Sequence, residues 1–308
     1  MNKKFVVIGC LEETVDTLNA LIMYGCKPDH IITLKQENVN INKVTNYVDL
    51  TNWSKENNIP CSYVEYYDLK DVNDQETIRN INPDILMVIG WQRLIPESIL
   101  ECINIGTIGF HGSSNFLPWG RGRSPINWSI LENKTRFILH MFFINPGIDD
   151  GDIIGMEAYD INQWDTCRSL YYKTSIAQAK LIRKFLPLLF QGKFPTFPQI
   201  GEPFYYQKRT PEDGHINWKL EANSICRLVR AVTSPYPGAF CYYKEDKGKV
   251  MVWEAQPFTN DLFNSAKKGE VVFISYNEKE FVVKTLNGSL LITKYSAERP
   301  PKVGELLE

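Results

Sequence analysis

The sequence predicts an α/β fold, a mostly parallel sheet with helices on both faces, followed by a small β-barrel-like domain. Two observations predict the sheet. Short apolar runs alternate with stretches of helical periodicity from Phe5 onward, and the segment 84–89 is almost continuously apolar, as in a strand buried on both faces. One observation predicts the second domain: short alternating segments follow residue 238 and are separated by glycines.

The elements of the first domain follow in order. Strands are expected where short apolar runs occur, at 5–8, 31–34, 61–64, 84–89 and 103–110. Helices are expected at 12–24, 50–57 and 75–81, the first ended by Gly25 and the last by Pro83. Ser124 and Pro125 predict a further helix start, with Ser124 as its N-cap. A long amphipathic helix is expected at 164–189. This alternation predicts a Rossmann-like arrangement.

Prolines and glycines then gather between residues 195 and 211, which is typical of a linker or an extended crossing segment. A helix at 223–231 and strands at 239–243, 250–253, 271–274, 281–285 and 290–293 should follow. The expected division is a catalytic domain at 1–192, a linker at 193–211 and an OB-like β domain at 212–308.

The composition narrows the class of protein. The chain has 308 residues, 44% of them apolar, and a formal net charge of -2, which argues against a nucleic-acid binder that depends on a strong basic field. Its seven cysteines form no Cys-x-x-Cys pair and its four histidines lack ligand spacing, so no metal site is expected. The N-terminal apolar run is too short for a signal peptide and no run reaches membrane-span length. We expect a cytoplasmic protein.

The central segment carries the candidate chemistry. His111 follows an apolar run, and Asp149 lies in a Gly-Ile-Asp-Asp-Gly turn where a carboxylate can be presented. A histidine oriented by a carboxylate is a common arrangement for proton transfer near neutral pH, although a lone histidine at a strand end is more often structural. The glycines and arginines of 120–123 precede a helix start, a place suited to an anionic or polar ligand. Gly9 stands without a Gly-x-Gly-x-x-Gly pattern, so a dinucleotide site is not indicated.

Together, these pieces resemble the central signature of the folate-dependent formyltransferases, which include methionyl-tRNA formyltransferases and sugar N-formyltransferases. That signature is Asn-x-His, then a Leu-Pro loop with Arg-Gly and Ala/Ser-Pro, then Gly-Leu/Ile/Val-Asp-x-Gly-Asp. The corresponding segments here are 109–111, 117–125 and 147–152. A second resemblance, to the start of the family's C-terminal barrel domain, lies in 213–218, 227–231 and 235–239.

The resemblance implies transfer of a formyl group from N10-formyltetrahydrofolate to an amine, without a metal. His111 would donate to the oxyanion and Asp149 would hold the imidazole and help remove the amine proton. The folate would lie along Trp91, Gln92, Arg93, Leu94, Leu117, Pro118, Gly120, Arg121 and Asp152. A flat pterin suits backbone hydrogen bonds in an apolar slot.

One residue departs from the family pattern. The usual catalytic Asn is replaced by Gly109, which has no side-chain donor. We hypothesise that Asn115, or alternatively Ser113 or Ser114, supplies the missing donor. The competing interpretation is that Asn115 only makes the turn.

The acceptor is expected to be a nucleotide-linked amino sugar, because the Leu-Pro segment is short and its charges are only Arg121 and Arg123. A tRNA acceptor would call for a basic field. Substrate contacts are expected from Gly109, Ser113, Arg209, Arg230 and Tyr236, with Arg227 a further candidate for the diphosphate. The alternatives are methionyl-tRNA formylation, or a folate-binding or folate-hydrolysing relative without transferase activity. Relatives are often homodimers, and we expect one here.

Overall fold

The computed structural model describes residues 3–42, 44 and 46–308, and the chain forms two compact units. Unit 1 comprises Met1–Gly122, Arg136–Asp160 and Tyr171–Tyr206, and unit 2 comprises Arg123–Thr135, Ile161–Leu170 and Gln207–Glu308. The units are therefore interleaved along the chain. The expected division at 1–192, 193–211 and 212–308 stays a prediction.

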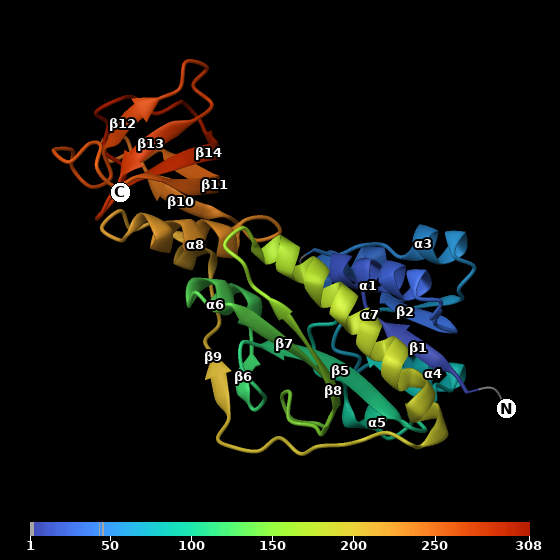
Figure 1. The fold of residues 1–308 in the computed structure, drawn as a ribbon. Coiled ribbons are helices and arrows are strands. Elements are labelled where there is room, and N and C mark those ends of the chain that lie inside the picture. The colour runs from blue at the N-terminus through green and yellow to red at the C-terminus, as the bar shows by residue number, and fades with distance from the viewer. Residues whose placement is uncertain (1–2, 43, 45) are drawn as a thin grey trace. The chain divides into compact units, whose positions relative to one another are not determined.

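The elements of unit 1 alternate as expected in its first half (Figure 1). Its strands are β1 (Phe5–Ile8), β2 (His30–Leu34), β3 (Cys61–Val64), β4 (Ile85–Val88), β5 (Gly106–Ser113), β6 (Trp119–Gly122), β7 (Arg136–Phe143), β8 (Ile153–Asp160) and β9 (Phe204–Tyr206). Its helices are α1 (Glu12–Met23), the 3-10 turn η1 (Gln36–Asn38), α2 (Val39–Asn42), α3 (Thr51–Glu56), α4 (Val72–Ile81) and α5 (Glu97–Leu100). Most of α7 (Cys167–Gln191) belongs to it as well.

Seven strands form one sheet in the order β3-β2-β1-β4-β5-β7-β8. The pairs from β3 to β5 are parallel, whereas β5-β7 and β7-β8 are antiparallel. After β1 the chain builds β2 and β3 on one side, then returns to place β4 and β5 on the other. The strand order therefore reverses between β1 and β4, and in open α/β sheets ligands bind beyond the carboxyl ends of the strands at such a point.

Helices cover both faces of this sheet. Alternate residues of each strand point to opposite sides and pack against different helices. Phe5 and Val7 pack with α1 and α7, which lie side by side in Figure 1. Val6 and Ile8 pack on the opposite face with Ile78 of α4 and Ile99 of α5. The predicted fold class is confirmed.

Several local expectations need correction. Helix α4 begins at Val72 because the Asp71 carboxylate accepts hydrogen bonds from the amides of Asn73 and Asp74, a cap that apolar spacing does not show. Strand β5 extends to Ser113, so His111 lies within the strand instead of after it. Ser124 does not cap α6 (Pro125–Leu131): its φ of 60° is left-handed and its side chain makes no cap hydrogen bond.

Unit 2 contains α6, the 3-10 turn η2 (Pro211–Gly214), α8 (Ala222–Val232) and five antiparallel strands. These are β10 (Ala239–Tyr242), β11 (Lys249–Thr259), β12 (Val271–Ile274), β13 (Phe281–Lys284) and β14 (Ser289–Ala297), in the order β10-β11-β14-β13-β12. The C-terminal segment 305–308 hydrogen-bonds to both edges: Glu308 exchanges backbone bonds with Tyr242, and Val271 donates to the Glu305 carbonyl. The segment thus closes the sheet into the barrel-like form that the sequence predicts.

Candidate active site

A pocket of about 210 Å³ opens at the strand-order reversal of unit 1. One wall comes from Glu13, just after β1, and another from residues 90–95, just after β4. The turn after β7 contributes Asn145, Gly147 and Asp149. Position in the fold and the residues that line it therefore agree with the crevice expected from the topology.

Close packing of backbone shapes the floor of this crevice. A Cβ on Gly9 would lie 2.0 Å from the carbonyl oxygen of Ile89, so no other residue fits there without a shift. The Thr14 hydroxyl donates to that same carbonyl at 2.8 Å and accepts from the Leu11 amide. Gly9 thus allows β1 and β4 to end side by side, which is the close approach that its place after a buried strand permits.

The four residues predicted for the folate, Trp91, Gln92, Arg93 and Leu94, all line this pocket. Tyr67 holds the segment from behind: its hydroxyl accepts from the Gln92 amide at 2.7 Å, and its ring lies 4.5 Å from that of Trp91. The indole N–H of Trp91 is buried and has no acceptor within the part of the chain that the structure describes. The segment 91–94 therefore gives this wall of the pocket an aromatic surface.

His111 and Asp149 come together, as the sequence predicts. His111 Nδ1 lies 3.5 Å from an Asp149 carboxylate oxygen, and that oxygen also accepts from the Gly122 amide at 3.1 Å. Asp149 has a left-handed φ of 51°, a conformation unusual for aspartate that turns its carboxylate inward from a tight turn. Asp149 lines the pocket, whereas His111 is not among the residues that line it.

The other ring nitrogen of His111 is engaged as well. Nε2 lies 2.8 Å from the Gly120 carbonyl, which can only accept, so Nε2 carries a proton and donates. Ser113 is fully buried. Its hydroxyl lies so close to Gly120 that a Cβ at that position would overlap it. The imidazole therefore connects the Gly/Arg loop to the carboxylate. Leu117 and Pro118 are buried, and Leu117 packs with Phe142.

A residue that sequence reasoning missed, Gln199, holds the two loops together. Its amide nitrogen donates to the carbonyls of Asp149 and Gly151, at 2.8 and 2.9 Å. Its amide oxygen accepts from the Arg121 guanidinium, at 2.7 Å for the closer nitrogen. The Arg121 guanidinium is therefore already hydrogen-bonded within unit 1. A glutamine in a proline-rich segment carries no pattern that would have identified it.

Gly109 lines the pocket and has no side-chain donor. Two asparagines are candidates to supply that donor. Asn115 is exposed and lies outside the pocket lining, and its amide oxygen accepts from the Phe116 amide, as in a turn. Asn145, which was not predicted, lines the same pocket as Gly109 and Asp149. The Ile144 side chain occupies the space beside Gly109, 2.9 Å from where a Cβ would be.

A second carboxyl group, Glu13, also faces the pocket and was not predicted. Gln178 donates to it at 2.8 Å and accepts from Thr17 at 2.6 Å. Burial raises the pKa of Glu13, the bond from Gln178 lowers it and the neighbouring Asp16 raises it. The pocket therefore has two carboxyl groups in different surroundings, one held by an amide and one beside an imidazole.

The remaining predicted contacts lie elsewhere. Asp152 is exposed, and its backbone carbonyl accepts from the Phe143 amide. Arg209, Arg230 and Tyr236 belong to unit 2, where the Arg209 guanidinium stacks 5.2 Å from the Trp128 ring. Among residues 3–42, 44 and 46–308, no three His, Cys, Asp or Glu side chains converge as a metal site would need. Within the same described residues, no helix is long and apolar enough to cross a membrane.

Fold and site together define an α/β protein with a ligand pocket at a strand-order reversal and a His–Asp pair at its edge. The chain belongs to the formyl transferase family. Residues 25–186 match the family described as formyl transferase, and residues 208–303 match the formyl transferase C-terminal domain. The family predicted from the sequence is therefore confirmed.

Solved structures share the fold. HypX from Aquifex aeolicus in complex with tetrahydrofolic acid is 17% identical with a TM-score of 0.66, over 97% of this chain and 45% of its own. The chain thus spans less than half the length of HypX. An N-formyltransferase from Helicobacter canadensis, in complex with folinic acid and dTDP-3-aminofucose, is 18% identical with a TM-score of 0.62, over 96% and 100%. The methionyl-tRNA formyltransferase from Clostridium thermocellum is 24% identical with a TM-score of 0.52, over 74% and 92%.

Proposed function

We propose that the protein transfers a formyl group from N10-formyltetrahydrofolate to the primary amine of a nucleotide-linked amino sugar. The observation that carries the proposal is the placement of Asp149 in one pocket with 91–94, with its carboxylate 3.5 Å from His111. The full-length similarity to the Helicobacter canadensis enzyme, whose complex holds folinic acid and an amino sugar nucleotide, supports the same donor and acceptor classes.

The donor supplies a formyl group bound to nitrogen. The amine forms a new C–N bond to the formyl carbon, the bond from that carbon to N10 breaks, and the proton lost by the amine is balanced by one gained at N10. We assign removal of the amine proton to Asp149, and its position in the pocket lining supports this role. His111 lies beside the Asp149 carboxylate, with Nδ1 3.5 Å from it. The role proposed for His111 is to donate its Nε2–H to the developing oxyanion, which would have to replace the Gly120 carbonyl, 2.8 Å away, as the acceptor.

Several features support a small acceptor over tRNA. The net charge is -2, and Arg121 is bonded to Gln199 and Tyr205 within unit 1. Arg209, Arg230 and Tyr236 of unit 2 remain the proposed substrate contacts. The seven cysteines are free thiols, which fits the proposed cytoplasmic location. A homodimer is also proposed, and size-exclusion chromatography with light scattering tests it.

The decisive experiment offers N10-formyltetrahydrofolate with a panel of dTDP- and UDP-linked amino sugars, and separately with methionyl initiator tRNA. We expect tetrahydrofolate release only when an amino sugar is present, with a product 28 Da heavier, the mass of a formyl group replacing hydrogen. Robust tRNA formylation with no sugar accepted would overturn the acceptor. Release without any acceptor would show hydrolysis instead.

The roles of the pair are tested separately from the acceptor. Asp149→Asn should lower kcat by roughly 10²–10⁴-fold while leaving folate binding measurable, because the amide keeps the shape and loses the base. Asp150→Asn is the matched control, an exposed carboxylate in the same turn that does not line the pocket. Equal activity of the two variants would exclude Asp149 as the base.

A further inference from the structure

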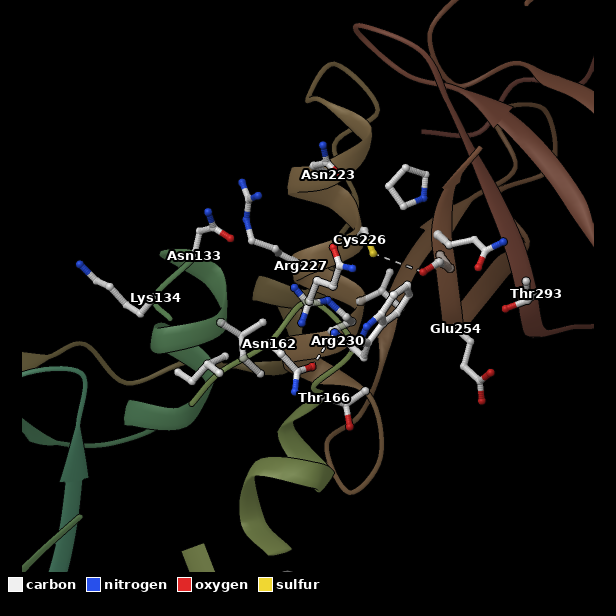
Figure 2. Close-up of a pocket in the computed structure, with 18 of the residues that line it drawn as sticks. Asn133, Lys134, Asn162, Thr166, Asn223, Cys226, Arg227, Arg230, Glu254 and Thr293 are labelled. Atoms are coloured by element: carbon white, nitrogen blue, oxygen red, sulfur yellow. Dashed lines mark hydrogen bonds between the residues drawn. The ribbon is translucent and has the colours of Figure 1, made fainter. Parts of the chain in front are cut away.

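A second and larger pocket, of about 810 Å³, lies wholly within unit 2. One side of α8 forms a wall, the loop after α6 and the segment 161–166 form another, and β11 contributes the third (Figure 2). Its volume is in the range of sites for nucleotide-sized ligands. Because every lining residue belongs to unit 2, the pocket can be described without reference to unit 1.

Two arginines dominate its chemistry. Arg227 and Arg230 are three residues apart on α8, so their side chains share one face of the helix. Arg227 donates to the Ser224 hydroxyl at 2.9 Å, and Arg230 donates to the Asp165 carbonyl. The Nε–H groups of both arginines are buried and have no acceptor among the described residues.

Nothing acidic neutralises this pair within the described part of the chain. Neither Arg227 nor Arg230 forms an ion pair there, and the single acidic side chain of the lining, Glu254, pairs instead with Lys294 at 3.4 Å. Buried guanidinium donors without acceptors are costly unless an anion binds them. Arginine's planar set of donors matches the oxygens of phosphate groups.

The same pocket exposes aromatic surface. The side chain of Trp164 is 77% exposed, and Trp253 lines the β11 wall with its indole nitrogen donating to Ser296. Flat rings of this kind stack on nucleic-acid bases with little preference for sequence. The lining also includes polar side chains, among them Asn133, Asn223 and Thr293, which Figure 2 labels.

We propose that this pocket of unit 2 binds a nucleoside diphosphate, with Arg227 and Arg230 holding the diphosphate and Trp164 stacking on the base. The inference rests on the proposed function only for the choice of nucleotides to test. The side chains suit a planar base joined to an anionic group, because Arg227, Arg230 and Trp164 all line one cavity.

Isothermal titration of the full chain with UDP, dTDP and pyrophosphate tests the site. We expect nucleoside diphosphates to bind, and Arg227→Gln to weaken them about ten- to a hundredfold, as expected for the loss of charge-assisted hydrogen bonds. Lys268→Gln is the matched control, since it removes one exposed positive charge of unit 2 outside the pocket. Equal affinity of Arg227→Gln and wild type, or no binding of either nucleotide, would overturn the proposal.

Two further variants separate the parts of the inference. Trp164→Ala should weaken UDP and dTDP but leave pyrophosphate binding unchanged, and an equal loss for all three ligands would remove the assignment of the indole to the base. His111→Ala should bind nucleotide as wild type does. If no amino sugar is formylated while Arg227-dependent binding persists, the proposed function fails and this site stands. If sugars are formylated and Arg227→Gln binds nucleotide as tightly as wild type, the proposed function stands and this site fails.

Discussion

Few side chains decide the chemistry of the pocket, and each works through its immediate neighbours. Asp149 faces the cavity because its left-handed backbone turns it inward, and His111 reaches it from the sheet. Glu13, near the start of α1, lines another wall of the same pocket and is held by Gln178. The family's asparagine is absent at Gly109, so the source of an oxyanion donor is the open question at this scale.

The position of Asn145 answers that question with a testable alternative to Asn115. Because Asn145 lines the pocket and Asn115 does not, we expect Asn145→Ala to lower kcat by about 10²-fold, the usual effect of losing one oxyanion donor. Asn115→Ala is the matched comparison and should act mainly on stability through its turn. Steady-state kinetics with the formyl donor and an accepted amine measure both. A large loss in Asn115→Ala alone would favour the hypothesis drawn from the sequence.

His140 sets the acid stability of the strands that carry the site. It lies opposite His111 in the β5-β7 pair, fully buried, with Nδ1 donating to the His111 carbonyl at 3.3 Å. Burial lowers the pKa of His140 to about 4, the bond to that carbonyl raises it and the charge of His111 lowers it. The unfolded chain therefore binds a proton near pH 6.5, before the folded chain does.

It follows that stability should fall as pH drops from 6.5 to 4, by about 3 kcal/mol from this group alone. Urea unfolding at a series of pH values measures the effect. In His140→Gln the loss over that window should be smaller by this amount, whereas His215→Gln, an exposed histidine of unit 2, should keep the wild-type slope. Identical slopes in wild type and His140→Gln would contradict the assignment.

At the scale of elements, the segment 193–206 does more than connect the chain. Phe197 exchanges backbone hydrogen bonds with Ile153, and Phe204 stacks on Trp119 at 4.8 Å. Between these contacts, Gln199 ties Arg121 to the carbonyls of Asp149 and Gly151. The crossing segment therefore holds the loop around Arg121 and the turn that carries Asp149.

Removal of the Gln199 side chain should lower kcat more than it lowers the stability of the fold. We expect Gln199→Ala to lower kcat by roughly tenfold with little change in thermal stability, since Asp149 loses its support while the sheet is untouched. Gln191→Ala, an exposed glutamine at the end of α7, is the control and should behave as wild type. If Gln199→Ala keeps full activity, the segment serves only as a connection.

The sequence predicts some elements better than others for physical reasons. Strands such as β1 are buried on both faces, so their apolar runs are unambiguous. The run that forms β7 is equally compatible with a buried helix, and the sequence pattern does not predict β7 or β8. The pair His111–Asp149 could be predicted because both motifs are local. Gln199, Asn145 and Glu13 could not, because only long-range pairing brings them to the pocket.

At the scale of the whole molecule, chain order and spatial grouping differ. Helix α6 and the segment 161–170 belong to unit 2, where the Asn127 amide donates to the Ala231 carbonyl of α8. No composition change marks those segments, so boundaries read along the sequence treat them as part of the first domain. A similar long-range effect closes unit 2, since Glu308 bonds to Tyr242 and Glu305 bonds to Val271, which lie 66 and 34 positions earlier.

That closure yields the last prediction. Deleting 305–308 removes backbone bonds to both edge strands, β10 and β12, and exposes the cavity that Leu307 fills, a side chain that is only 3% accessible. We expect unit 2 to lose roughly 3 kcal/mol or more of stability. Thermal unfolding followed by the fluorescence of the tryptophans of unit 2 should show a lower midpoint. Glu308→Gln, which keeps the backbone bonds, should retain most of the wild-type stability. If the shortened chain unfolds at the same midpoint temperature as the wild type, the five-stranded sheet is stable with both edges open.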